Sequence, residues 1–136
     1  MAEYSLTIPT AVAVGEAVPF NNVIRKGCCN IRHRAGSGII TVKGGTCCHP
    51  NLYRVYFHAT VTGVAGTIQL GIFLDGELLP ETLMSVVPAA ATGVWSVDAM
   101  TEIYSEGAND TISVRVVEGD TVTVNSASII VDKEVA

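Results

Sequence analysis

Charged residues are scarce in this chain of 136 residues. Lys, Arg, Asp and Glu make up 15% of it, against about 25% in an average soluble domain, while apolar residues make up 49%. A single chain with so little charge cannot cover all of its apolar surface, so we expect part of that surface to contact copies of the same chain. The net charge of −5 argues against general binding to nucleic acids.

Long apolar runs are absent as well. No stretch approaches the ~18 uncharged apolar residues of a membrane span, so we expect no membrane insertion. The N-terminus also lacks a signal peptide: Glu3 stands where cations are expected, and Pro9, Gly15 and Glu16 interrupt the apolar residues. We therefore expect synthesis in a host cytoplasm, with release inside a virus particle as a route out of the cell.

The motifs of common enzyme classes are missing too. The sequence holds no phosphate-binding glycine loop, no serine nucleophile elbow and no H-E-x-x-H metal motif. Its three histidines are scattered, at His33, His49 and His58. No side chains have the spacing of a nucleophile, a base and an orienting group. We expect a protein that is not an enzyme and that uses no cofactor and no resident metal.

Period-two alternation, in contrast, is abundant. Apolar and polar residues alternate through residues 53–62 and again through residues 68–74, which end at the hairpin pair Asp75-Gly76. Similar segments recur about every ten residues, which predicts an all-β, single-domain jelly-roll sandwich of about ten antiparallel strands. After an arm or first strand within residues 2–14, strands are expected at residues 18–24, 30–34, 38–43, 53–62, 68–74, 81–87, 94–103, 111–117, 121–125 and 128–132.

The few charges are unevenly distributed along the chain. Residues 1–54 hold six cations and two acids, whereas residues 55–136 hold two cations and eleven acids. Four cations flank a single predicted turn, and we expect them to form a docking patch for an acidic surface. These residues are Arg25, Lys26, Arg32 and Arg34. Two solvated faces of opposite charge are the alternative.

Two cysteine doublets, Cys28-Cys29 and Cys47-Cys48, bracket the turn predicted at Gly36–Gly38. Neighbouring residues on a strand point to opposite faces, so one hairpin register would place Cys28 beside Cys48 and Cys29 beside Cys47. Disulfides of this kind require an oxidising environment. Free thiols are the second interpretation, and a metal site with His49 is the third, because the doublets lack the C-x-x-C spacing of common zinc sites.

Several segments follow one another in an order that resembles a known family, the jelly rolls of the tumour necrosis factor and complement-head type. The resemblance is to the short versions found in bacteria and their phages, and it covers roughly residues 14–133. Two departures are visible: residues 49–52 replace the usual glycine before the Tyr-containing strand, and no collagen-like stalk is present. The segments are 15–20 (GEAVPF), 36–38 (GSG), 52–57 (LYRVYF), 68–76 (IQLGIFLDG), 111–116 (TISVRV) and a final strand that ends at Lys133.

The resemblance implies a jelly-roll domain at residues 14–136, with residues 1–13 as an N-terminal arm or first strand. It also implies a homotrimer whose outer surface binds partners. We expect Tyr56, Phe73 and Trp95 to be possible trimer contacts. A chain without stalk or signal is more similar to a phage structural protein, which would decorate a capsid and lie on the virion surface. The alternative is a trimeric adhesion module that binds a glycan or a cell-surface receptor.

Overall fold

The computed structural model describes residues 1–136 except 28, 47, 64–65, 88–92, 120–121 and 135–136. The described residues form twelve strands and one short 3-10 turn, η1 (Pro80–Thr82). The prediction of an all-β jelly roll is therefore confirmed. Within the described ranges, no helix combines the length and the apolar character that a membrane crossing requires.

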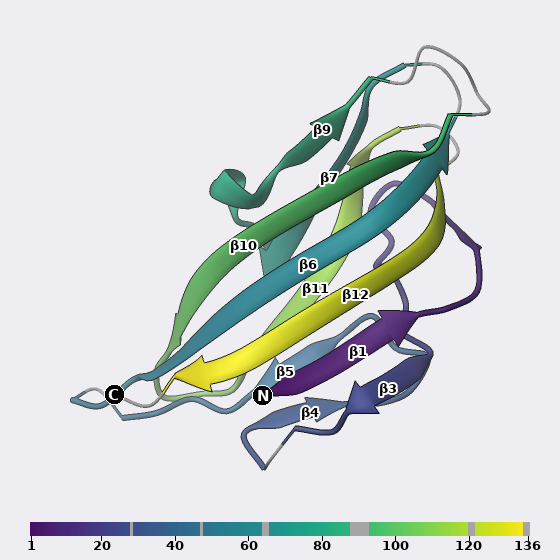
Figure 1. The fold of residues 1–136 in the computed structure, drawn as a ribbon. Coiled ribbons are helices and arrows are strands. Elements are labelled where there is room, and N and C mark those ends of the chain that lie inside the picture. Colours follow the sequence, from purple (N-terminus) through teal and green to yellow (C-terminus); the bar gives the residue numbers. More distant parts are fainter. Residues whose placement is uncertain (28, 47, 64–65, 88–92, 120–121, 135–136) are drawn as a thin grey trace.

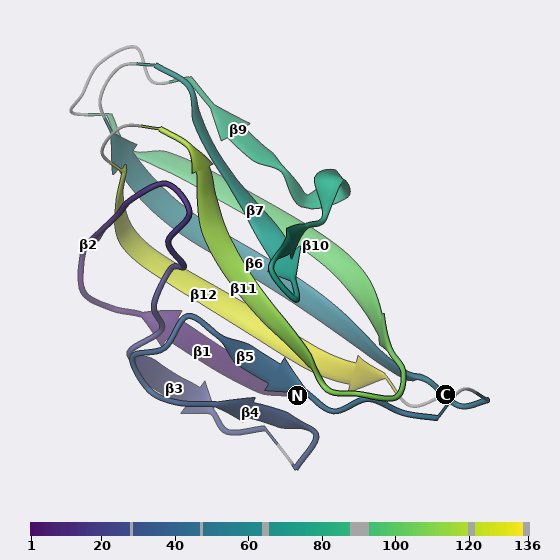
Figure 2. The ribbon, with the colours of Figure 1, turned by 180° about the vertical axis from the view of Figure 1, so that it is seen from behind.

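Two antiparallel sheets face each other (Figures 1 and 2). The first sheet has the order β10–β6–β12–β1–β3, with β2 beside β12. Its strands are β10 (Trp95–Ser105), β6 (Asn51–Gly63), β12 (Val122–Glu134), β1 (Ala2–Leu6), β3 (Asn22–Arg25) and β2 (Thr10–Val12). The second sheet has the order β4–β5–β11–β7–β8, with β9 beside β7. Its strands are β4 (Ile31–His33), β5 (Ile40–Val42), β11 (Asp110–Glu118), β7 (Ile68–Leu74), β8 (Glu77–Leu78) and β9 (Met84–Val86).

The core fills the space between the two sheets, as the period-two pattern predicts. The inward residues of β6 and β7 are buried, whereas alternate residues of β6 point to the opposite side of the sheet. Phe20 packs edge-on against Phe57, with ring centroids 6.5 Å apart. The six inward residues of the two patterned strands are Tyr53, Val55, Phe57, Ile68, Leu70 and Ile72, each no more than 2% exposed.

The last strand differs from the sequence expectation. Residues 122–125 and 128–132 are not in two strands but in one continuous strand, β12, and residue 121 lies outside the described residues. The polar residues between them do not interrupt it, because a register shift between Val124 and Ser126 lets the strand continue along β6. A bulge of this kind depends on the partner strand, so the polar run resembled a turn in the sequence.

Three further segments also differ from expectation. The predicted strand 18–24 is shorter, since only Asn22–Arg25 forms β3, and Val18 instead donates a backbone hydrogen bond of 2.7 Å to Val114. The predicted strand 81–87 begins as η1, because Pro80 has no N–H for a ladder. Residues 2–14 contain β1 and β2. The strand β1 lies inside the first sheet, between β12 and β3.

Candidate docking surfaces

The outer face of the first sheet, which we define by the outward side chains of β6, β10 and β12, carries an apolar row. Met100 of β10 lies opposite Tyr56 of β6, and Tyr56 lies opposite Ile130 of β12. The side chains of Met100 and Tyr56 are 53% and 43% exposed. A shallow hollow of about 360 Å³ borders all three residues. Three adjacent strands thus present an apolar row to solvent, and the polar side chains of His58, Asp98 and Ser128 line the same hollow.

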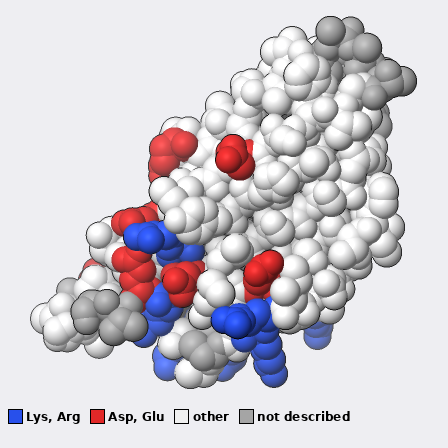
Figure 3. All heavy atoms as spheres, viewed as in Figure 1, with Lys and Arg blue, Asp and Glu red and all other residues white. Residues whose placement is uncertain are grey.

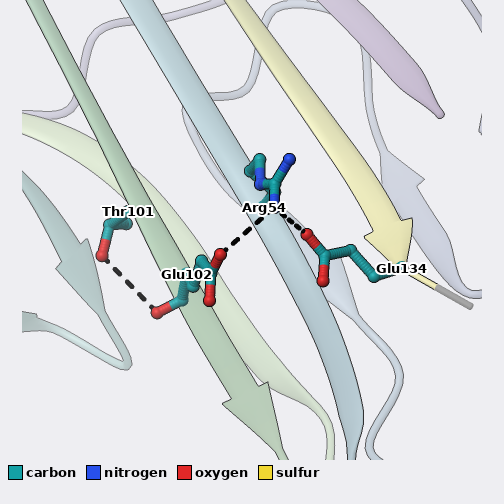
Figure 4. Close-up of polar contacts among 4 residues, drawn as sticks. All are labelled: Arg54, Thr101, Glu102 and Glu134. Atoms are coloured by element: carbon teal, nitrogen blue, oxygen red, sulfur yellow. Dashed lines mark hydrogen bonds and ion pairs between the residues drawn. The ribbon is translucent and has the colours of Figure 1, made fainter. Parts of the chain in front are cut away.

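The next row of side chains on the outer face is charged. Its cation, Arg54, is paired with acidic side chains. The guanidinium of Arg54 contacts Glu134 and lies 3.3 Å from Oε1 of Glu102 (Figure 4). The hydrogen bond to Glu102, followed by the charge of Glu134, raises the pKa of Arg54. Cross-strand neighbours on one face interact in this way when opposite charges face each other. The arginine therefore leaves no free positive charge on this face.

The three possible trimer contacts do not lie together on one face. Tyr56 is on the outer face of the first sheet, and Trp95 begins β10, where it is 37% exposed. Phe73 belongs to β7 of the second sheet, with the guanidinium carbon of Arg115 5.6 Å from its ring centroid. Tyr56 and Phe73 are thus on different sheets. The role of all three residues in a trimer stays a prediction.

A second surface lies where β3 and β4, the terminal strands of the two sheets, run beside each other (Figures 1 and 2). The four cations expected in a docking patch are all exposed here, and we call this surface the cationic edge. Blue side chains gather toward the lower end of the molecule, with red side chains beside some of them, whereas the top right of this face is uncharged (Figure 3). None of the ion pairs among the described residues includes Arg25, Lys26, Arg32 or Arg34.

The cysteine doublets lie near the cationic edge. Cys29 and Cys48 are exposed, whereas Cys28 and Cys47 are outside the described residues. The register of β4 with β5 sets Ile31 opposite Val42, and the chain after Lys43 turns away to bond to residues 105–107. The hairpin ladder therefore ends before it reaches the doublets. Both disulfide pairings stay predictions. In the part of the chain that the structure describes, no three metal-binding side chains converge on one point.

An acid pair, Asp75 and Asp110, joins two turns of the second sheet. Asp75 has a positive φ of 52° and accepts a 2.8 Å hydrogen bond from the backbone N–H of Thr111. A hydrogen bond from Asp110, followed by that of Thr111, lowers the pKa of Asp75. Burial and the proximity of Asp75 raise the pKa of Asp110. The hydrogen-bonded pair links the two turns, and Asp110 holds a proton more readily than Asp75 does.

Sequence reasoning missed the partners of two residues. Met100 and Ile130 join Tyr56 only through strand pairing, and Glu102 and Glu134 join Arg54 in the same way. A signal was present in the segment 94–103, where Met100 falls among the polar alternate positions of the strand. Met100 becomes informative only once strand pairing sets it beside Tyr56 and Ile130, because a contiguous apolar patch, rather than a single apolar residue, indicates an interaction surface.

No protein-family model matches the sequence, and no curated protein matches it. Solved structures, however, match over nearly the whole chain. The globular domain of zebrafish complement 1qA protein has a TM-score of 0.66 at 11% identity, with 95% of this chain and 94% of that chain covered. Eiger TNF from S. frugiperda has a TM-score of 0.66 at 14% identity, with 99% and 91% covered. Murine APRIL has a TM-score of 0.61 at 14% identity, with 94% and 97% covered.

At identities this low, the agreement concerns the fold alone. It extends from one end of the chain to the other, and each compared domain is covered almost completely. The chain has the jelly-roll fold of complement 1q and tumour necrosis factor domains.

Proposed function

We propose that this chain is a non-enzymatic display protein: a homotrimeric jelly roll that decorates a phage capsid or a similar surface assembly. The observation that carries the proposal is the division of its surface. The outer face of the first sheet carries an apolar row suited to contact copies of the chain, and one edge holds four cations without described anionic partners. In this proposal the protein is made in the host cytoplasm and ends on the virion surface.

The apolar row on the outer face supports self-association. Tyr56, Met100 and Ile130 form a continuous patch that stays in contact with water in a single chain. Burying such area stabilises a complex by about 25 cal/mol per Å² before the costs of association are subtracted. Three chains of 14.3 kDa should therefore scatter light as one species of about three times that mass at micromolar concentration. A stable species with the mass of one chain would contradict the trimer.

The cationic edge supports attachment to an acidic surface. Exposed charges are screened by salt, with a Debye length of about 10 Å at 0.1 M, so attachment should weaken as the ionic strength rises. Replacing Arg25, Lys26, Arg32 and Arg34 with Ser should release the trimer from its particles and leave its unfolding curve nearly unchanged. The control Lys43→Ser/Lys133→Ser removes charge outside this group. Normal attachment of the fourfold variant in both low and high salt would refute the docking role.

The alternative function is adhesion to a glycan or a cell-surface receptor. Glycan recognition commonly uses neighbouring aromatic rings, but Trp95 and Tyr104 lie at opposite ends of β10. The arrangement therefore favours display over sugar binding. A glycan array run beside a pull-down from whole particles separates the two functions. Strong glycan binding that survives loss of the cationic edge would favour adhesion.

A further inference from the structure

A groove of about 570 Å³ opens between the terminal strands β3 and β4 at the cationic edge. Its volume is within the range of roughly 300–1,000 Å³ that is usual for sites of small organic ligands. The groove belongs to a single chain, so it depends neither on the trimer nor on attachment to an assembly. The groove has an apolar floor, and two cations, Lys26 and Arg32, line it.

The floor of the groove is apolar and rests on a buried ring. Tyr4, which is only 2% exposed, reaches it from β1 inside the first sheet. The ring of Tyr4 stacks on His33 with centroids 4.3 Å apart. Val23, Ile31 and Ala35 complete the apolar lining. An apolar ligand body can displace water from such a surface without ordering a mobile loop.

Two cations, Lys26 and Arg32, line the same groove. Both are exposed, and neither takes part in an ion pair among the described residues. A guanidinium binds carboxylate or sulfonate oxygens through two parallel hydrogen bonds, and an ammonium adds a point charge. The positive charge beside the apolar floor is thus available to an anionic group of a ligand.

His33, which also lines the groove, is held in place through one of its ring nitrogens. Nε2 of His33 lies 2.8 Å from the carbonyl oxygen of Ser37, and since a carbonyl only accepts, Nε2 carries the proton. Nδ1 of His33 is buried and has no hydrogen-bond partner among the described residues. Buried polar atoms are nearly always paired with protein or water. Because it is buried, this atom does not face the open groove, and the groups there that can bind an anion are Lys26 and Arg32.

We propose that the groove binds a small organic anion with an apolar body, such as an aromatic or long aliphatic carboxylate or sulfonate. The apolar floor accommodates the body, and Lys26 and Arg32 bind the anionic head. Inorganic phosphate would leave the floor unused, and a neutral hydrocarbon would leave both cations unused. The combination of floor and cations selects amphipathic anions over both.

The test uses 8-anilinonaphthalene-1-sulfonate, whose fluorescence rises in apolar sites, and its uncharged analogue N-phenyl-1-naphthylamine. We expect the sulfonate to bind saturably with one molecule per chain. The variant Lys26→Gln/Arg32→Gln should weaken sulfonate binding by about ten-fold or more, because two charge-assisted contacts are lost. Binding of the uncharged analogue should change by less than about two-fold, since it makes neither contact.

Two further variants decide whether the groove itself is the site. Arg34→Gln/Lys43→Gln removes the same charge from the same end of the molecule, but neither residue lines this groove; it should leave sulfonate binding nearly unchanged. Val23→Trp should block both probes by filling the groove from the exposed terminal strand. Circular dichroism checks the fold of each variant. Equal weakening by the two double variants, or probe binding that Val23→Trp leaves intact, would overturn the proposal.

Discussion

The outer face of the first sheet and the cationic edge are built from the same kind of strand but differ in their pairing. On the outer face, β6 is paired along its length with β10 on one side and β12 on the other. At the cationic edge, β3 has four residues and β4 has three, and each has only one neighbour. The paired face carries an apolar row, and its Arg54 is paired with acids. The edge, in contrast, holds cations without described anionic partners.

The difference shows how the position of a strand decides what its side chains can do. A central strand sets its side chains into cross-strand rows, so apolar residues join into patches and opposite charges pair. A terminal strand has free backbone groups on one side, and charges there discourage pairing with another chain. The cations of β3 and β4 can therefore serve as a barrier to aggregation as well as a docking patch. The fourfold Ser variant separates the two roles. If the cations act only as a barrier, their removal should cause aggregation without loss of attachment.

The largest effect is expected from a charge placed in the apolar row. Tyr56→Glu should shift the trimer to single chains, with dissociation about 100-fold or more easier, because a buried carboxylate without a partner is costly at an interface. Sedimentation velocity over a range of concentrations measures this shift. Ile8→Glu adds the same charge at a side chain that is 60% exposed in the loop after β1. If Ile8→Glu dissociates the protein equally, the outer face is not the trimer interface.

An intermediate effect, on stability, is expected from a substitution at Gly27, where the cationic edge packs against Ala2 of β1. A Cβ added at Gly27 would lie 2.9 Å from Cβ of Ile31 and 3.0 Å from Cβ of Ala2, and these atoms move only with their backbone. Gly27→Ala should therefore lower the free energy of unfolding by about 1–3 kcal/mol. Urea unfolding at one fixed protein concentration measures it, since self-association also stabilises the fold. An unchanged urea midpoint would mean that the chain around Gly27 can shift away from β1 without loss of stability.

The smallest effect is expected at the acid pair, which belongs to neither surface. The raised pKa of Asp110 means that its contribution to stability is present at low pH and is lost as the pH rises through the folded-state pKa. Asp75 has a lowered pKa, so its contribution is present at neutral pH and is lost on acidification. Asp110→Asn removes the unfavourable charge and keeps a donor for Asp75.

This variant should therefore gain a few tenths of a kcal/mol at neutral pH, because both groups are partly solvated. The gain should vanish near pH 3, where Asp110 of the original chain is already protonated. Thermal unfolding at the two pH values checks the prediction. A gain of equal size at both would mean that the charge of Asp110 is not its cause.

The candidate surfaces were only partly predictable. The proximity of Lys26 and Arg32 follows from their places on either side of one turn, and the structure sets both in one groove. The apolar row was not predictable, because Tyr56, Met100 and Ile130 are far apart in the chain and meet only through register. The hairpin register assumed for the cysteines ends at Lys43, since the following residues bond to a turn of another strand instead.

The sequence by itself determined the class of fold and the composition of the core. Period-two alternation makes one face of each strand apolar, and only a second sheet can cover such faces, so residues such as Tyr53 and Ile72 had to be buried. Tertiary structure alone decided which strands are neighbours, that β12 continues through its bulge, and that β3 and β4 are terminal. The reason is physical: alternation specifies which side of a strand is buried, but pairing depends on hydrogen bonds and packing between segments far apart in the chain.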